Sequence, residues 1–265
     1  MQSAELPKIQ RVRLDIAYDG THYMGWQRLG QGRSTIQGTL EAIIGKLLNH
    51  EIYLMGSGRT DSGVHARRQV AHFDTTQNLQ RYQLVNAINA LTPPDIKIKA
   101  AYLCPGDFHA LAQVKRKIYK YYILNRPVSS AFNYRYTWWI RKPLDIEYLN
   151  LLSQILVGRH DFASFRTQGS PVKSTVRQVY SATWKYKRPD LLVFTVCGNG
   201  FLKQMIRNIV GTLVDFHLRG KDTDALLQVL KAQDRRQAGP TAPPQGLFLH
   251  NVIYPSHLDI KCRKL

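Results

Sequence analysis

Residues 11–18 read Arg-Val-Arg-Leu-Asp-Ile-Ala-Tyr, in which polar and apolar side chains alternate. Alternation with a period of two is typical of a strand that buries one face. Behind Ser34 and Gln37, which have the spacing of a capping box, apolar residues recur at helical spacing. The sequence therefore predicts a helix over about 35–49 after the first strand.

The same kinds of pattern continue to residue 103. They predict strands near 51–56, 68–75 and 95–103, and a helix over 79–91 that is closed by the two prolines following it. The resulting succession, β-α-β-β-α-β, is that of the ferredoxin-like fold.

The second half of the chain has similar patterns. They predict, in order, a strand at 115–125, a helix at 145–157, strands at 174–187 and 190–197, helices at 201–218 and 222–233 and a strand at 247–253. We therefore predict an α+β protein made of two ferredoxin-like halves, 1–105 and 106–265, joined near 104–114. Each half is expected to hold an antiparallel sheet with helices on one face.

The net charge narrows the range of partners. The chain has 37 Lys and Arg against 18 Asp and Glu, which gives a formal net charge of +19 at pH 7. An excess of this size usually serves a polyanion, either a nucleic acid or an anionic membrane. The chain has no apolar run long enough to span a bilayer, and residues 1–10 lack the apolar segment of a signal peptide. A nucleic acid is therefore favoured, and no membrane is expected.

The cysteines predict a cytoplasmic protein with reduced thiols. They are Cys104, Cys197 and Cys262, an odd number without any short spacing. The histidines are scattered and form no metal-ligand pattern with the cysteines. A zinc site is therefore not expected, nor is any other metal.

The Gly-rich loop 56–66 is the first candidate site. Its glycines permit positive φ and a close approach to a ligand, and the fork-shaped guanidinium of Arg59 suits a phosphate or a carboxylate. Asp61 is the only acidic residue over 57–72, where it lies among Arg59, Arg67 and Arg68. By spacing alone, three interpretations stay open: a catalytic carboxylate, an Asp that hydrogen-bonds its own turn, and a phosphate-binding nest.

The stretch 111–142 is the second candidate, because it combines positive charge with aromatic rings and contains no acidic residue. Its basic residues are Lys115, Arg116, Lys117, Lys120, Arg126, Arg135, Arg141 and Lys142, and its aromatic residues include Tyr119, Tyr121, Tyr122, Trp138 and Trp139. Basic residues hold phosphates, and aromatic faces stack on unpaired bases. The alternative is a strand with one core face and one solvated face, but the combination favours an RNA surface.

Lys203 and Arg207 form the third candidate. They lie one turn apart on one side of the helix predicted at 201–218. Taken by themselves, they are best explained as part of a solvated face.

Several ordered motifs make the chain resemble the TruA-type tRNA pseudouridine synthase family from about residue 14 to residue 255. They are Tyr18-Asp19-Gly20-Thr21 with Gly25-Trp26-Gln27, the loop Gly58-Arg59-Thr60-Asp61-Ser62-Gly63-Val64-His65-Ala66, Phe108-His109-Ala110 with Tyr119, His160 to Phe165, Phe201 to Gly211, and Pro244-Gln245-Gly246-Leu247.

The resemblance implies the pseudouridine synthase fold and the isomerisation of uridine to pseudouridine at positions 38, 39 and 40 of the tRNA anticodon stem–loop. It implies that the enzyme needs no cofactor and no metal, and that it works as a homodimer. By motif, Asp61 is the nucleophile and Arg59 helps to extrude the target base. Tyr119 contacts the uracil ring, and Arg207 pairs with the Asp61 carboxylate.

Three positions differ from the usual family pattern. Ser62 follows the catalytic Asp where Ala is frequent, and Leu111 stands where Arg is usual. Arg67 and Arg68 occupy a segment in which the family usually has a Gly.

Two other functions fit parts of the same pattern. A non-catalytic RNA-binding protein on the same scaffold would share the charge and the aromatic residues, but it has no need for a lone Asp among arginines. A metal-dependent nuclease would need clustered carboxylates. If the chain is a synthase, the Asp61 carboxylate attacks C1′, attacks C6 or abstracts the C2′ proton, and the sequence leaves all three routes open.

Overall fold

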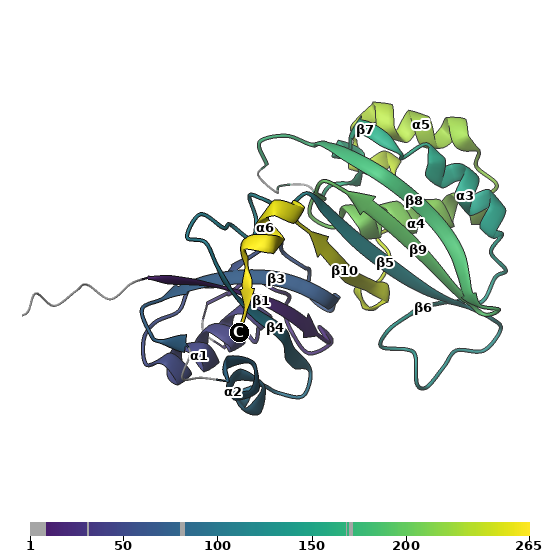
Figure 1. The fold of residues 1–265 in the computed structure, drawn as a ribbon. Helices are drawn as coiled ribbons and strands as arrows, with labels where there is room; N and C mark the ends of the chain where they lie inside the picture. The colour runs from purple at the N-terminus through teal and green to yellow at the C-terminus, as the bar shows by residue number, and fades with distance from the viewer. Residues whose placement is uncertain (1–8, 31, 80–82, 168, 170–171) are drawn as a thin grey trace, which may run out of the picture. The chain divides into compact units, whose positions relative to one another are not determined.

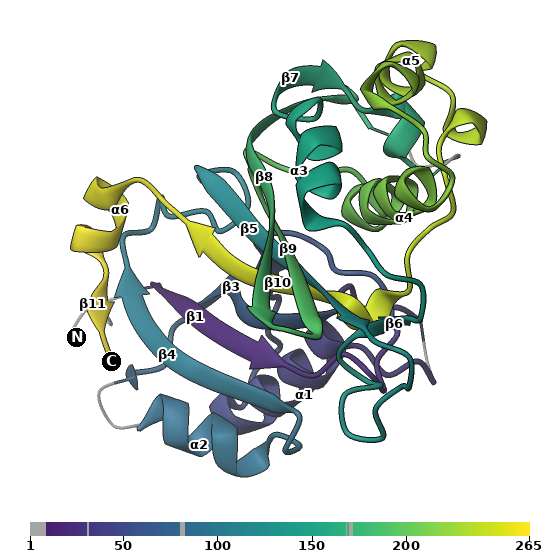
Figure 2. The ribbon, with the colours of Figure 1, turned by 90° about the vertical axis from the view of Figure 1, so that its right-hand side faces the viewer.

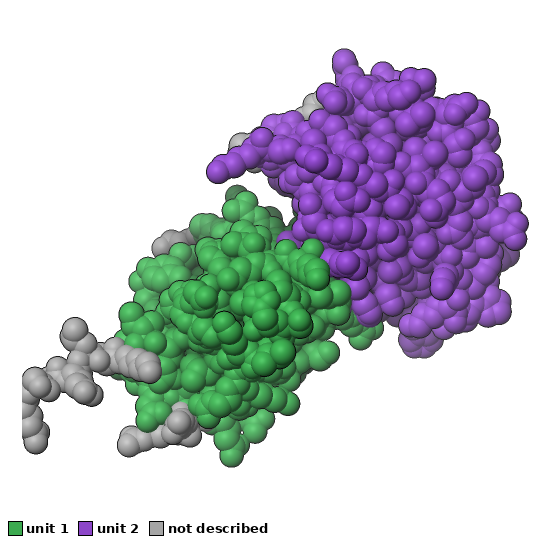
Figure 3. Space-filling view, turned by 45° about the horizontal axis from the view of Figure 1, so that its top comes forward, with its two compact units in different colours: residues 1–115, 251–265 green, residues 116–250 purple. Residues whose placement is uncertain are grey.

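The computed structural model describes residues 9–30, 32–79, 83–167, 169 and 172–265. The chain forms two compact units, residues 1–115 with 251–265 and residues 116–250 (Figure 3). This division differs from the predicted halves in two respects. The boundary lies ten residues later than the predicted one at 105/106, and the C-terminal segment belongs to the first unit because it pairs with a strand there.

The first unit is built on β1 (Gln10–Tyr18), β3 (His65–Thr75) and β4 (Ile96–Cys104), in the order β4-β1-β3 (Figure 1). All of their pairings are antiparallel, with Leu14 opposite both Ala71 and Ala101. The short strand β2 (Met55–Gly56) pairs with β3. The predicted strands at 11–18, 68–75 and 95–103 are therefore confirmed.

Helices α1 (Ile36–Leu48) and α2 (Leu84–Leu91) cover one face of this sheet (Figure 2). Both helices bury apolar side chains, and the strand residues Val12, Leu14 and Ile16 are fully buried. The predicted capping box is wrong, because the N-cap of α1 is Thr35, whose hydroxyl accepts the Gly38 N–H. Residues 80–82 of the second predicted helix lie outside the described residues, and α2 begins at Leu84.

The predicted strand at 51–56 is mostly absent. The Leu54 N–H donates to the Glu41 carboxylate, and the Gln37 side-chain amide donates to the Leu54 carbonyl. Because these side chains of α1 satisfy the backbone of Leu54, it does not pair with a neighbouring strand. Only Met55 and Gly56 join β3.

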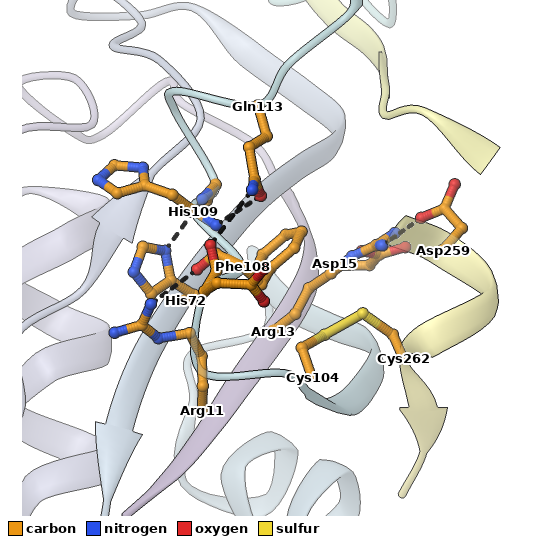
Figure 4. Close-up of a disulfide and its surroundings, with 12 residues drawn as sticks. Arg11, Arg13, Asp15, His72, Cys104, Phe108, His109, Gln113, Asp259 and Cys262 are labelled. Carbon is orange, nitrogen blue, oxygen red and sulfur yellow. Dashed lines mark hydrogen bonds and ion pairs between the residues drawn. A yellow bond between two sulfur atoms is a disulfide. The ribbon is translucent and has the colours of Figure 1, made fainter. Parts of the chain in front are cut away.

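The C-terminal segment closes the first unit through α6 (Ser256–Lys261) and β11 (Arg263–Lys264), which pairs with β4. A disulfide joins Cys104 at the end of β4 to Cys262, so the prediction of a protein with reduced thiols is wrong for this pair (Figure 4). Beside it, the buried Arg13 guanidinium contacts the carboxylates of Asp15 and Asp259. Cys197 is a free thiol.

The second unit has the strand order β10-β5-β9-β8-β7. These strands are β5 (Arg116–Asn125), β7 (Gly158–Asp161), β8 (Val176–Arg188), β9 (Leu191–Gly198) and β10 (Leu247–Ile253), and β6 (Trp138–Ile140) runs parallel to β5. The last residues of β10 belong to the first unit. Two of these strands, β6 and β7, were not predicted from the sequence.

Three helices accompany this sheet, namely α3 (Ile146–Gln154), α4 (Met205–Leu218) and α5 (Thr223–Ala232). Short 3-10 turns occur at Ala163–Phe165, Arg235–Gln237 and Pro244–Gly246. The helix predicted from residue 201 begins only at Met205. Gln204 has a φ of +58°, and the carbonyl of Lys203 accepts the Thr167 N–H, so this segment is held outside the helix.

The predicted α+β class is confirmed, whereas the ferredoxin-like character of the two halves stays a prediction. Within the described part of the chain, no helix is long and apolar enough to cross a membrane.

Candidate active site

The loop between β2 and β3 carries Asp61, and the buried side chain of Gln69 holds its first residues. The Gln69 carbonyl oxygen accepts the Ser57 hydroxyl at 2.6 Å and the Val70 N–H at 3.1 Å. Its amide donates to the Gly58 carbonyl at 2.8 Å. One glutamine thus ties the loop to the strand that follows it.

Thr60, the residue before Asp61, is held by two residues from the start of the chain. The Tyr18 hydroxyl lies 2.7 Å from the Thr60 hydroxyl, and the Trp26 N–H donates to the Thr60 carbonyl at 3.1 Å. Tyr18 is buried, and burial raises the pKa of its hydroxyl, so the phenol stays neutral. This contact therefore keeps its hydrogen across the physiological pH range.

On the other side of Asp61, the carbonyl of Tyr23 accepts the Ser62 hydroxyl at 3.2 Å and the Gly63 N–H at 3.3 Å. The Asp61 carbonyl accepts the Val64 N–H at 3.2 Å, which closes the turn. The backbone of Asp61 is thus restrained on both sides.

Gly25 lets this loop pack closely on residues 20–26. It has a φ of +94°, and a Cβ at this position would lie 2.6 Å from the Thr60 carbonyl oxygen. At Gly20, a Cβ would lie 2.0 Å from the carbonyl oxygen of Val64. Any side chain at either position would push the Asp61 loop away, which explains why glycine is needed in this segment.

The arginines that lie near Asp61 in the sequence differ in burial and in their contacts. Asp61 is half-buried, whereas Arg59 and Arg67 are exposed. Arg68 instead binds the buried Asp15 carboxylate at 2.8 Å and the Asn251 side chain at 2.9 Å. Arg68 is therefore part of the scaffold of the first unit.

Tyr119 lies in β5 of the second unit. Its ring is buried and meets the Phe201 ring edge-on, with centroids 5.4 Å apart. Tyr121 points to the same face of the strand, and its hydroxyl donates to the Pro243 carbonyl at 2.7 Å. Burial raises the pKa of Tyr121, and the positive charge of Arg207 opposes that shift.

Arg207 extends from the first turn of α4. Its Nε donates to the Ala242 carbonyl at 2.8 Å, and its own carbonyl accepts the Ala242 N–H at 3.0 Å. Because the guanidinium is planar, the bond at Nε sets the direction of the whole group. The predicted pairing of Lys203 and Arg207 on one helix face is wrong, because Lys203 precedes the helix.

The segment that supplies the Ala242 carbonyl is itself fastened to α4. Asn208 accepts hydrogen bonds from Thr241 at 2.7 Å and from Arg235 at 3.2 Å. At Gly211, a Cβ would lie 1.8 Å from the Pro240 carbonyl oxygen, so only glycine allows this contact. Of the predicted site residues, Arg59 and Asp61 therefore lie in the first unit, and Tyr119 and Arg207 lie in the second.

A family model described as tRNA pseudouridine synthase matches residues 16–111 and 152–255. The chain belongs to the tRNA pseudouridine synthase family. The enzyme is therefore an isomerase, as the sequence predicted.

Relatives match nearly the whole length of this tRNA pseudouridine synthase. A tRNA pseudouridine synthase A of Bdellovibrio bacteriovorus is 44% identical over 259 residues, covering 96% of this chain and 99% of the relative. Another, from a Thermoanaerobacter species, is 41% identical over 93% of this chain and 100% of its own length. A chain from a crystal structure of a Cbf5-Nop10-Gar1 complex aligns with 12% identity and a TM-score of 0.35, which supports no conclusion about the fold.

Two family motifs in this synthase serve packing. In the block from His160 to Phe165, Phe162 and Phe165 are fully buried, and the Phe165 carbonyl accepts the Asn208 side-chain amide at 2.8 Å. In the block from Phe108, the Ala110 carbonyl accepts the Tyr254 hydroxyl at 2.6 Å. Each of these contacts lies within one unit and stabilises the packing there.

The departures from the family pattern have visible consequences. The hydroxyl of Ser62 makes the bond to Tyr23 that an alanine would lack. Leu111 is exposed, and so is Arg67. None of these changes alters the carboxylate of Asp61.

The residues that hold the Asp61 loop, chiefly Gln69, Tyr18 and Tyr23, were not predicted from the sequence. Tyr18 stands in the opening motif, which was the only signal available. Among the described residues, no group of three or more His, Cys, Asp or Glu is arranged to hold a metal ion.

Proposed function

We propose that this tRNA pseudouridine synthase isomerises uridine at positions 38, 39 and 40 of the tRNA anticodon stem–loop, with Asp61 as the nucleophile. The observation that carries the proposal is the restrained, half-buried position of Asp61 between Thr60 and Ser62. The family match supports the modification of tRNA, and the net charge of +19 fits an RNA substrate.

The reaction breaks the N1–C1′ bond, rotates the base and forms a C5–C1′ bond. The C5 proton is lost and N1 gains a proton, so the atoms balance without an oxidant, a reductant or water as a reactant. We therefore propose that the enzyme uses neither a metal nor a cofactor. Because a paired uracil is hidden in a helix, the nucleotide must first be flipped out.

A carboxylate suits the next step because it acts as a nucleophile or as a base. The fixed backbone on both sides of Asp61 limits the positions that its carboxylate reaches, which favours a reactive geometry. Arg59 is exposed on the same loop, two residues away. We assign to it the extrusion of the target base and the occupation of the vacated space.

Two residues of the second unit complete the proposed machinery. Arg207, oriented by its bond to the Ala242 carbonyl, would pair with the Asp61 carboxylate and orient it. Tyr119 would present its ring to the uracil, and its hydroxyl would accept the C5 proton. The buried position of Tyr119 against Phe201 suits a group that works in a closed pocket.

The proposal also includes the setting in which the enzyme acts. We propose a cytoplasmic homodimer whose subunits jointly grip one tRNA. A surface with this excess of basic residues favours long-range attraction of RNA.

The test is release of tritium from tRNA labelled at C5 of uridine, followed by mapping of pseudouridine with carbodiimide and reverse transcription. We expect release by the pure protein in excess chelator, with new stops at positions 38, 39 and 40. Binding without release would support the rival RNA-binding protein instead. Strand cleavage that stops on chelation would support a nuclease.

A further inference from the structure

We propose that the loop of residues 126–137 between β5 and β6, here called the aromatic loop, is a second nucleotide site on which an unpaired base of the tRNA stacks. The inference rests on the proposed function, since it assumes that tRNA is the bound RNA. The loop projects from the sheet of the second unit below the label β6 (Figure 1).

Three aromatic rings are exposed in this loop. Phe132 is 90% exposed, Tyr134 is 57% exposed and Tyr136 is 39% exposed. By contrast, Tyr119 and Tyr121 of β5 are buried. The aromatic loop therefore offers exposed rings for stacking, whereas Tyr119 and Tyr121 do not.

Hydrogen bonds within the aromatic loop fix the conformation of its backbone. The Ser130 hydroxyl accepts the N–H groups of Phe132 and Asn133 at 3.3 and 3.1 Å. The Asn133 carbonyl accepts the Thr137 hydroxyl and the Tyr136 N–H, each at 2.9 Å. The rings are thus presented on a formed backbone, which lowers the entropy lost when a ligand binds.

The base of the loop is also fastened. Arg126 donates to the carbonyls of Val128 and Ser129 at 2.7 and 3.1 Å and contacts the Asp190 carboxylate at 3.2 Å. The Trp139 indole donates to the Arg126 carbonyl at 2.9 Å. Arg126 is therefore part of the loop's support.

The positive charge of the aromatic loop and of the residues around it favours RNA as the ligand. Residues 108–144 contain no Asp or Glu. The exposed Arg135 lies beside Tyr134, with its guanidinium carbon 5.4 Å from the ring centroid and its Nε donating to the hydroxyl at 2.8 Å. A polyanion such as RNA complements the positive charge of this surface. Aromatic rings beside arginine are typical of sites for unpaired bases.

Tyr119 and the start of the aromatic loop are separated by much of the length of β5. Tyr119 and Asn125 are six positions apart in the continuous strand β5, and an extended strand rises about 3.3 Å per residue, or roughly 20 Å over this length. The aromatic loop begins beyond this far end of the strand. The aromatic loop would therefore hold a nucleotide other than the uridine that reacts.

The experiment compares tRNA binding by wild type, Phe132→Ala, Phe132→Trp and the matched control Val128→Ala. Val128 is also apolar, 73% exposed and in the same loop. We expect Phe132→Ala to raise Kd roughly tenfold or more, the usual effect of losing one stacked base. Phe132→Trp should bind like wild type, and its added fluorescence should be quenched by tRNA. Val128→Ala should bind like wild type.

Unchanged Kd in Phe132→Ala, or fluorescence of Phe132→Trp that tRNA does not quench, would overturn the inference. A change of sedimentation from dimer to monomer in Phe132→Ala would also overturn it, because the loop would then hold a second copy. Tritium release by wild type is measured in parallel. If wild type releases none while Phe132→Ala still weakens binding, the proposed function fails and the stacking site stands.

Discussion

The hydroxyl of Tyr18 lies 2.7 Å from the hydroxyl of Thr60, the residue that precedes Asp61. Both side chains are buried, and they come from parts of the chain separated by 42 positions. The position of the Asp61 loop thus depends on a residue in β1.

The first prediction concerns this pair. Tyr18→Phe leaves the Thr60 hydroxyl buried without its bond, so the free energy of unfolding should fall by about 1–2 kcal/mol. Thr60→Val should cost a similar amount, and the double variant less than the sum, because both hydroxyls are then gone. Urea unfolding of the four proteins measures the coupling, with Tyr186→Phe, at an exposed tyrosine, as the control. Strict additivity would contradict the predicted bond.

The second prediction concerns Asp61. Asp61→Asn keeps the shape of the side chain but removes the nucleophilic carboxylate, so tritium release should be lost while tRNA binding stays within a few fold. Asp224→Asn changes the same charge at an exposed position in α5 and should keep full activity. Product formed by Asp61→Asn at the wild-type rate would remove the nucleophile from the proposal.

The third prediction concerns Arg207. Lysine keeps the charge but lacks the planar group that the Ala242 carbonyl orients. We expect Arg207→Lys to lower kcat more than tenfold with a smaller change in KM, since the carboxylate partner is lost in the reacting complex. Arg219→Lys, just past the same helix and largely exposed, is the control. A rise in KM with unchanged kcat would show that Arg207 only binds RNA.

The fourth prediction concerns the disulfide. Cys104 and Cys262 are separated by 158 positions, so their bond restricts the unfolded chain strongly. In the absence of reductant, Cys262→Ser should unfold about 2–5 kcal/mol more easily than wild type. Reductant should destabilise wild type by a similar amount and leave Cys262→Ser unchanged. The free thiol provides the control, because Cys197→Ser should respond to reductant like wild type.

The fifth prediction concerns His72, whose Nδ1 accepts the Ala110 N–H. Burial lowers the pKa of His72 from 6.5 to about 4, and the charge of Arg11 adds to the shift. Between these pH values the unfolded chain binds the proton more readily than the folded one. Stability is therefore fully present above pH 6.5 and is lost as the pH falls toward 4.

Between pH 7 and pH 5, the shifted pKa of His72 should lower the free energy of unfolding by roughly 2 kcal/mol. Urea unfolding of wild type and His72→Gln at both pH values isolates its share, because the other titrating groups are common to the two proteins. Equal pH dependence in the two proteins would show that His72 does not carry the effect.

Much of the secondary structure follows from local patterns. The alternation at 11–18 and the apolar spacing behind Ser34 predicted β1 and α1 within one or two residues. The errors occur where a distant group competes for the backbone. At Leu54 the competitor is the Glu41 carboxylate, and before Met205 it is Thr167.

The candidate site likewise combines features that the sequence predicts with features that it does not predict. The motif with Asp61 and its lone negative charge can be read from the sequence, as can the basic and aromatic character of 111–142. Which aromatic rings are exposed cannot be read in this way, because Tyr119 and Phe132 differ in burial rather than in type.

By itself, the sequence determined the α+β class, the main strands and helices, and the chemical identity of the candidate nucleophile. Those properties depend on side-chain periodicity and on the residue types within short segments. Only the tertiary structure decided that Tyr18, Tyr23 and Gln69 hold the Asp61 loop, that Ala242 orients Arg207, and that Cys104 meets Cys262. Each of these contacts joins residues that are distant in the chain, and such pairs are selected by packing of the whole unit.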